Sequence, residues 1–166
     1  MIVKHAEQPS AEWRAGVLTR LRVSEALGAR SLCVGEQWFQ PGKEAPLHRH
    51  PNAEEVVTVL AGSALFSLDG VESLVHADAS VILPAGSVHG FANVGDDALH
   101  VLGIYSSASP LTIYQDEPDV VIAIGATQGE QIDVTRTRWQ SPEAPVEPPV
   151  ATHDSFRSND TTAITG

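Results

Sequence analysis

The stretch from Gly42 to Gly62 reads GKEAPLHRHPNAEEVVTVLAG and places two histidines just before a glutamate pair. Residues two apart on an extended strand project from the same face. His48 and His50 are therefore expected on one face of a strand, with Arg49 on the other. A Pro-Asn turn then brings the chain back, and Glu55 begins the next strand. This arrangement predicts a carboxylate close to two imidazoles.

A second stretch, Pro84 to Asn93, reads PAGSVHGFAN. Its proline and glycine favour a tight turn, after which His89 opens a strand. Imidazole and carboxylate ligands together suit Fe, Mn, Ni, Cu or Zn. Two inward histidines without a metal would bury polar nitrogens at a cost of about 1–3 kcal/mol each. The pattern therefore predicts a divalent transition-metal site, without specifying which metal.

The two stretches together resemble the motifs of the small single-domain cupin family. The first cupin motif, G-x5-H-x-H-x3or4-E-x6-G, matches at Gly42, His48, His50, Glu55 and Gly62. The second, G-x5-P-x-G-x2-H-x3-N, matches at Pro84, Gly86, His89 and Asn93. Asp78 stands where the second motif opens with glycine, and aspartate also tolerates turn geometry.

The resemblance implies a jelly-roll barrel with a metal held inside it by His48, His50, Glu55 and His89. Glu54 is the rival carboxylate, but the spacing of six residues to Gly62 fits Glu55. Four protein ligands on an octahedral metal leave two positions open for water, oxygen or a bidentate substrate. Open positions of this sort are typical of catalytic metal sites rather than of closed structural ones.

The surrounding sequence favours short strands separated by turns. Residues 17–23 alternate, residues 55–60 are rich in β-branched side chains, and Asp69-Gly70 is a strong hairpin signal. We expect an all-β, antiparallel jelly-roll barrel with an irregular C-terminal tail. The expected division is an N-terminal arm with the first strands (1–30), the cupin barrel (31–115), a C-terminal strand or interface arm (116–139) and a flexible, proline-rich tail (140–166).

Strand parity suggests further side chains around the site. His100 lies on an expected barrel strand, so its imidazole either faces the cavity or tips outward. Facing the cavity, it would be a catalytic residue that shuttles protons near neutral pH. The substrate-pocket candidates are Gln37, Phe39, Phe91, Leu102 and Tyr105.

Composition limits the partners of this 166-residue chain. Its net charge of −11 argues against binding to nucleic acid or to an anionic membrane surface. One cysteine cannot form an internal disulfide or a Cys-rich zinc motif. The start of the chain has no secretory signal and no apolar stretch approaches 18 residues, so a cytoplasmic location is expected. Between His50 and Thr135 there is no Lys or Arg, which makes a metal the expected positive charge in the cavity.

The resemblance implies a metal-dependent enzyme that acts on a small organic molecule. The leading prediction is a dioxygenase-type oxidoreductase, because a three-His, one-Glu site recurs in cupin dioxygenases of the quercetinase and oxalate-oxidase kind. The alternatives are a redox-neutral lyase, isomerase or cyclase that uses the metal as a Lewis acid, and a cupin that binds a small ligand without catalysis. Cupins commonly pair, so a homodimer is expected, with the apolar residues 120–125 as a candidate part of its interface.

Overall fold

Alternating apolar and polar residues build two antiparallel sheets that face each other. The computed structural model describes residues 1–126. In the first sheet the order is β1 (Ser10–Arg14), β2 (Val17–Val23), β3 (Cys33–Phe39), β10 (Leu99–Tyr105), β5 (Glu55–Ala61) and β8 (Ala79–Leu83). In the second it is β12 (Val121–Ala123), β11 (Leu111–Tyr114), β4 (Glu44–Arg49), β9 (His89–Asn93), β6 (Ser63–Leu68) and β7 (Val71–His76).

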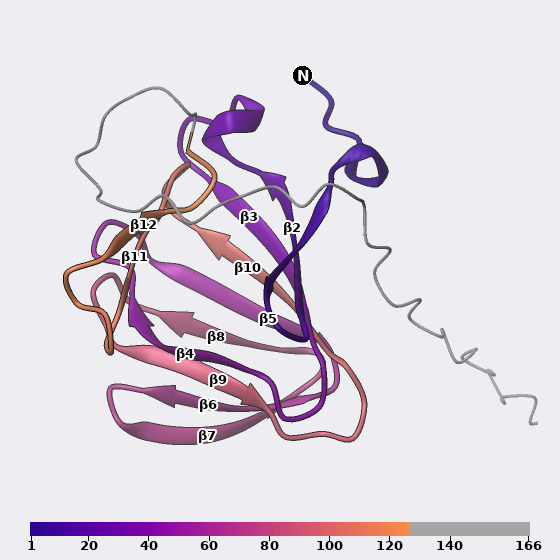
Figure 1. Ribbon diagram of the computed structural model, residues 1–166, viewed down its shortest axis with the longest axis vertical. Coiled ribbons are helices and arrows are strands. Elements are labelled where there is room, and N and C mark those ends of the chain that lie inside the picture. Colours follow the sequence, from indigo (N-terminus) through magenta and orange to yellow (C-terminus); the bar gives the residue numbers. More distant parts are fainter. Residues whose placement is uncertain (127–166) are drawn as a thin grey trace, which may run out of the picture.

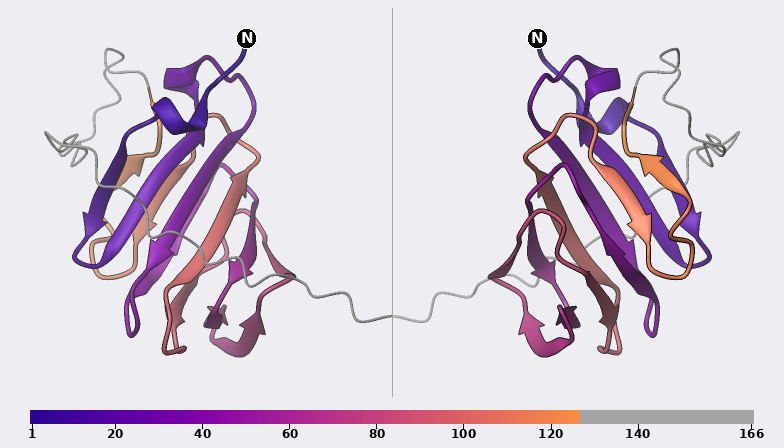
Figure 2. Two further views of the ribbon diagram at one scale, coloured as in Figure 1. Left: turned by 90° about the vertical axis from the view of Figure 1, so that its right-hand side faces the viewer. Right: turned by 90° about the vertical axis from the view of Figure 1, so that its left-hand side faces the viewer.

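The expected all-β, antiparallel jelly roll is confirmed. Figure 1 shows β4, β9, β6 and β7 side by side in the lower part of the view, and Figure 2 shows β1, β2 and β3 beside β10. The two sheets remain separate, so the fold is a sandwich rather than a closed barrel. Two 3₁₀ helices, His5–Glu7 and Glu25–Leu27, complete the elements of residues 1–126. Neither helix is long and apolar enough to cross a membrane.

Apolar side chains fill one end of the space between the sheets. Three phenylalanines form the aromatic part of this core. The Phe91 ring meets the Phe39 ring edge-on, with centroids 5.0 Å apart, and stacks on the Phe66 ring, with centroids 4.7 Å apart. The same cluster includes Val17, Ala45, Val57, Val59, Ala64, Leu83, Leu99 and Val101. Strands β4 and β10 begin in this core and run away from it, so their last residues lie at the opposite end of the sandwich.

Two residues at motif positions stabilise the loops that connect the strands. Asn93 is buried, and its amide donates to the carbonyls of Phe39 (2.9 Å) and Asp97 (2.8 Å) and accepts from the N–H of Gly95 (3.0 Å). Asp78 adopts a left-handed conformation, with φ of 67°. This is the turn geometry expected where aspartate replaces the motif glycine.

The apolar residues 120–125 contribute an edge strand of the protein's own sheet. β12 pairs with β11, with Ala123 opposite Leu111, and the Ile124 N–H donates to the Pro110 carbonyl at 2.9 Å. Of the two alternatives for the segment 116–139, the strand is therefore present at residues 121–123. The expected flexible tail, 140–166, lies outside the described residues, and the division of the chain into four segments stays a prediction.

Candidate metal centre

Four buried side chains converge at the end of the sandwich opposite the apolar core. His48 and His50 lie on β4, while Glu55 and His89 are the first residues of β5 and β9. His48 and His89 are direct partners in the β4–β9 ladder. One ligand atom from each of the four residues lies within 4.8 Å of all the others. The structure therefore brings together the four residues that the motifs suggested as ligands.

Backbone carbonyls fix the orientation of all three imidazoles. Nδ1 of His48 donates to the Pro46 carbonyl at 2.6 Å, that of His50 to Leu111 at 2.8 Å, and that of His89 to Ser87 at 3.0 Å. Because a carbonyl oxygen can only accept, the hydrogen of each ring resides on Nδ1. Each Nε2 is then left with a free lone pair, which is the form in which histidine binds a metal.

Two buried imidazole nitrogens without a hydrogen-bond partner indicate that these residues fit a metal. Nε2 of His50 and Nε2 of His89 are buried with no hydrogen-bond partner among the described residues. Both lie 3.2 Å from the same oxygen, Oε2 of Glu55. Buried nitrogens that face a carboxylate oxygen in this way are polar atoms that a bound cation would satisfy. Three imidazoles and a carboxylate fit a divalent transition metal.

The electrostatic environment favours the metal-binding forms of His48 and Glu55. Burial, and after it the charges of His50 and His89, lowers the pKa of His48 to about 3. Burial by itself raises the pKa of Glu55, but His50 and His89 outweigh burial, so this pKa lies below its ordinary value. Neutral imidazole and ionised carboxylate are the ligating species.

Tyr105 and Gly103 shape the wall of the cluster on β10. The Tyr105 ring meets His50 edge-on at 5.1 Å between centroids. Burial, and after it the charge of Glu55, raises the pKa of Tyr105 well above its ordinary value, so the hydroxyl stays protonated and can donate. A Cβ added at Gly103 would lie 3.0 Å from Glu55 Oε1 and 3.4 Å from the Tyr105 hydroxyl. The absence of a side chain at Gly103 thus leaves room for the carboxylate.

Tyr114 and Trp13 form the opposite wall and did not emerge from sequence reasoning. Tyr114 is the partner of His48 in the β11–β4 ladder, with ring centroids 5.6 Å apart, and Trp13 stacks on Tyr114 at 6.0 Å. Alternation along residues 111–114 would have placed Tyr114 on one face with Thr112, whose hydroxyl lies 3.3 Å from Nδ1 of His50. Nothing in the sequence links Trp13 to a histidine far along the chain.

The remaining pocket candidates divide between the inside and the outside of the sandwich. Tyr105 lies at the cluster, whereas Phe39 and Phe91 belong to the apolar core. Gln37 lies opposite Val101, on the inner face, and donates from Nε2 to the Thr19 hydroxyl at 3.0 Å. Leu102 lies on the outer face of β10, because Val101 and Gly103 on either side of it point inward.

His100 also lies on the outer face, which is the outward one of the two orientations that the strand pattern allows, so the catalytic role expected for a cavity-facing His100 does not apply. On β10 the inner positions are Leu99, Val101 and Tyr105, so His100 tips outward by alternation. Its Nε2 lies 2.8 Å from Oε1 of Glu36, and its ring stacks on Trp38 at 4.7 Å between centroids. The structure therefore does not bring His100 to the four ligand candidates.

Glu36 is the buried centre of this outer network. Its Oε2 accepts from Nε of Arg22 at 2.7 Å, while Oε1 faces His100. Burial by itself raises the pKa of Glu36, but the hydrogen bonds from Arg22 and His100 outweigh it, so this pKa lies below its ordinary value. His100 thus takes part in a satisfied ion-pair network on the outside of the sheet.

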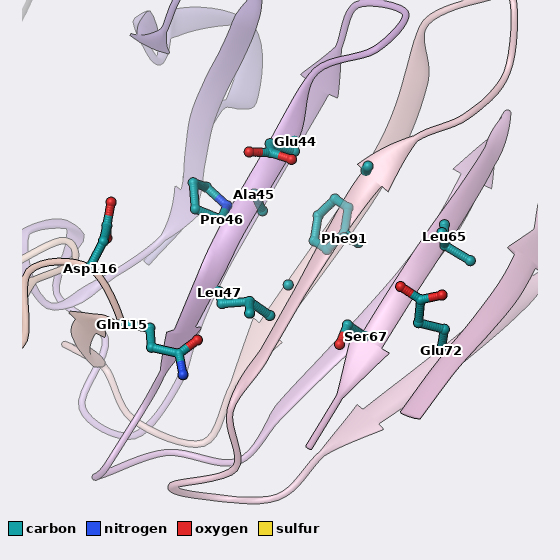
Figure 3. A pocket seen from close by; sticks show the side chains of 12 residues that line it. Glu44, Ala45, Pro46, Leu47, Leu65, Ser67, Glu72, Phe91, Gln115 and Asp116 are labelled. Atoms are coloured by element: carbon teal, nitrogen blue, oxygen red, sulfur yellow. The ribbon is translucent and has the colours of Figure 1, made fainter. Parts of the chain in front are cut away.

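A groove of about 610 Å3 lies on the outer face of the second sheet and does not include the cluster (Figure 3). It exists because Gly90 and Ala92 on β9 are small, while Leu47 on β4 and Leu65 on β6 rise on either side. Gly90 cannot carry a side chain, since a Cβ there would lie 2.7 Å from the Ala45 carbonyl oxygen. The groove is also lined by Glu44, Ala45, Pro46, Ser67, Glu72, Phe91, Gln115 and Asp116.

Comparison with known proteins links the chain to one family. The family described as Cupin domain matches residues 35–105. Protein SchB of Streptomyces halstedii is 32% identical over 95 residues, which cover 57% of this chain and 69% of SchB. The polyketide synthase CurC of Streptomyces cyaneus is 33% identical over 97 residues, which cover 58% of this chain and 63% of CurC.

A relative named for a different activity and a solved structure complete the comparison. Oxalate oxidase 1 of Hordeum vulgare is 30% identical over 119 residues, covering 62% of this chain and 59% of the relative. The chain thus spans about three fifths of CurC and of this oxalate oxidase. The structure of the polyketide cyclase RemF of Streptomyces resistomycificus superposes with a TM-score of 0.59 at 20% identity, covering 71% of this chain and 89% of RemF. At that identity the likeness to RemF shows the fold.

The room at Gly103 leads to a prediction about metal affinity. Gly103→Ala should weaken the binding of Mn(II) or Zn(II) about tenfold, because the added methyl displaces the Glu55 carboxylate. The matched control is Gly35→Ala, directly opposite on β3, where the nearest atom to an added Cβ is a Leu21 methyl at 3.8 Å. Competition titration with a chelating dye measures both affinities. Equal affinities of the two variants would contradict this role of Gly103.

Proposed function

Because the chain belongs to the cupin family, we propose that it is a metal-dependent enzyme that acts on a small organic molecule. One observation carries the proposal: two buried imidazole nitrogens, in His50 and His89, have no hydrogen-bond partner and face one oxygen of Glu55. A cluster with only a structural role would satisfy these nitrogens with a donor. The arrangement of the four side chains instead suits the binding of a metal cation.

His48, His50, Glu55 and His89 would hold the metal, which is Fe, Mn, Ni, Cu or Zn. When bound, such a metal polarises a substrate oxygen as a Lewis acid and supports oxygen-dependent oxidation. The carbonyls of Pro46, Leu111 and Ser87 keep the three rings aimed at one point throughout.

The aromatic walls act on the substrate rather than on the metal. The protonated Tyr105 hydroxyl is placed to donate a hydrogen bond beside Glu55, and the Tyr114 ring excludes water next to His48. A dry site strengthens every polar contact made inside it.

The leading reaction is a dioxygenase-type oxidation, and the similarity to oxalate oxidase 1 supports oxygen chemistry. The second candidate is a redox-neutral cyclisation, elimination or isomerisation. The similarity to the polyketide synthase CurC, together with the shared fold of the polyketide cyclase RemF, favours the cyclase among these. A cupin that binds a small ligand without turning it over is the third.

Removal of one ligand tests the metal site. His48→Ala and His89→Ala should abolish stoichiometric metal binding and leave the fold intact, since each removes one of the four ligand candidates. Elemental analysis of the purified variants measures the metal, and circular dichroism checks the fold. His76→Ala, at an exposed histidine on β7, is the matched control and should keep its metal. Full occupancy in the His48 and His89 variants would overturn the assignment.

Oxygen uptake separates the candidate reactions. Protein loaded with Fe(II) or Mn(II) is offered a panel of phenols, diketones and carboxylic acids while dissolved oxygen and substrate are followed together. The oxidoreductase predicts oxygen consumption that disappears in His48→Ala and persists in His76→Ala. Conversion of a substrate without oxygen uptake would favour the lyase, isomerase or cyclase, and tight binding without conversion would favour the non-catalytic cupin.

We also propose that the chain forms a homodimer through the outer face of the first sheet. Ile82, Val56, Ile104 and Val34 are successive cross-strand neighbours on that face, and Ile82 is 62% exposed. An apolar row on an open sheet face is typical of an interface. Light scattering should give twice the chain mass of 17.6 kDa. A monomeric mass would contradict the dimer.

A further inference from the structure

A β-bulge in β1 turns two consecutive side chains toward the second sheet. In the β1–β2 ladder Glu12 lies opposite Leu18 and Arg14 opposite Val17, with the register shifting between them. Val17 is buried in the core, so its partner Arg14 lies on the inner side of the sheet. Trp13 packs against the same core and stacks on Tyr114. Bulges of this kind re-aim side chains and are frequent next to active sites.

The bulge places the guanidinium of Arg14 one aromatic ring away from the candidate metal centre. Cζ of Arg14 lies 4.9 Å from the ring centroid of Tyr114 and 5.0 Å from that of Trp13. Tyr114 is in turn the cross-strand partner of His48, with centroids 5.6 Å apart. The guanidinium packs on both rings and hydrogen-bonds the Tyr114 hydroxyl, and its other N–H groups remain able to donate in the guanidinium plane.

Arg14 supplies a positive charge where the rest of the site has none. The ion pairs found among residues 1–126 do not include Arg14, whereas Arg22 is paired with Glu36 on the outer face. The strands that carry Glu55 and His89 lie between His50 and Thr135, a stretch without Lys or Arg. An anionic substrate could therefore meet a protein cation beside the cluster only from another part of the chain, and β1 brings one there.

We infer that Arg14 is a specificity-determining residue that binds the carboxylate of an organic acid whose apolar body lies against Trp13 and Tyr114. This inference rests on the proposed function and names its substrate class. The planar guanidinium offers paired N–H donors that match both oxygens of a carboxylate. Trp13 is half-buried and offers an apolar surface beside that carboxylate, and Tyr114, which is 4% exposed, contacts both Trp13 and His48.

The test compares two probes that differ in charge, benzoate and benzamide, on metal-loaded protein by calorimetric titration. Wild type should bind benzoate more tightly than benzamide, and Arg14→Gln should reduce this preference about tenfold, since a charged hydrogen bond is lost. Arg20→Gln is the matched control, because Cζ of Arg20 lies 5.7 Å from the Trp38 ring on the outer face of the same sheet. The control should keep the preference of the wild type within twofold.

Three results would overturn the inference: an unchanged preference in Arg14→Gln at equal metal content, a wild type that does not prefer benzoate, or a wild type that binds no benzoate. The same titrations on metal-free protein separate this inference from the proposed function. The contribution of Arg14 needs no metal, so the loss of preference in Arg14→Gln should persist there. A protein that takes up no metal but shows this loss would overturn the metal-dependent function and retain the role of Arg14.

Discussion

Three imidazoles must be buried around one carboxylate, and much of the molecule is arranged to allow it. Every ring needs its Nδ1 hydrogen accepted, and three backbone carbonyls, from Pro46, Leu111 and Ser87, do so. These carbonyls belong to different segments, so β4, β9 and β11 have to meet at one end of the second sheet. Glu55 arrives from the other sheet and faces the nitrogens that remain. The cluster thus depends on both sheets and also ties them together.

The interior of the sandwich has two different ends, one packed with apolar side chains and one that holds the histidine–glutamate cluster. At one end, Phe39, Phe66 and Phe91 exclude water by close aromatic packing. At the other, a glycine at position 103 gives the Glu55 carboxylate space that any larger residue would occupy. Tyr105 and Tyr114 border the cluster with rings that are apolar in body and polar at the tip. A substrate that reaches the four ligand candidates therefore meets apolar walls, few hydroxyls and, at the edge, the cation of Arg14.

The outer face of the first sheet carries a second buried carboxylate, that of Glu36. Glu36 is 3% exposed although it lies outside the core, and Arg22 and His100 satisfy both of its oxygens. Because Arg22 and His100 contact both oxygens, the face can be covered without leaving Glu36 as a lone buried charge. Sequence reasoning had left open which way His100 points, since the strand pattern is compatible with either face. In the structure Leu99 and Val101, on either side of it, belong to the apolar core, so alternation along the strand places His100 on the outer face.

The fold class could be predicted from the sequence, because alternation with a period of two defines the strands. The grouping of His48, His50, Glu55 and His89 was implied by the resemblance of their spacing to the cupin motifs. The side chains that surround these four residues could not be predicted in this way. Tyr114, Gly103 and the bulged Trp13–Arg14 pair come from strands distant in sequence, and their approach depends on ladder register and on one extra residue in β1. A register shift of one residue reverses the face of every side chain that follows, and no local pattern encodes it.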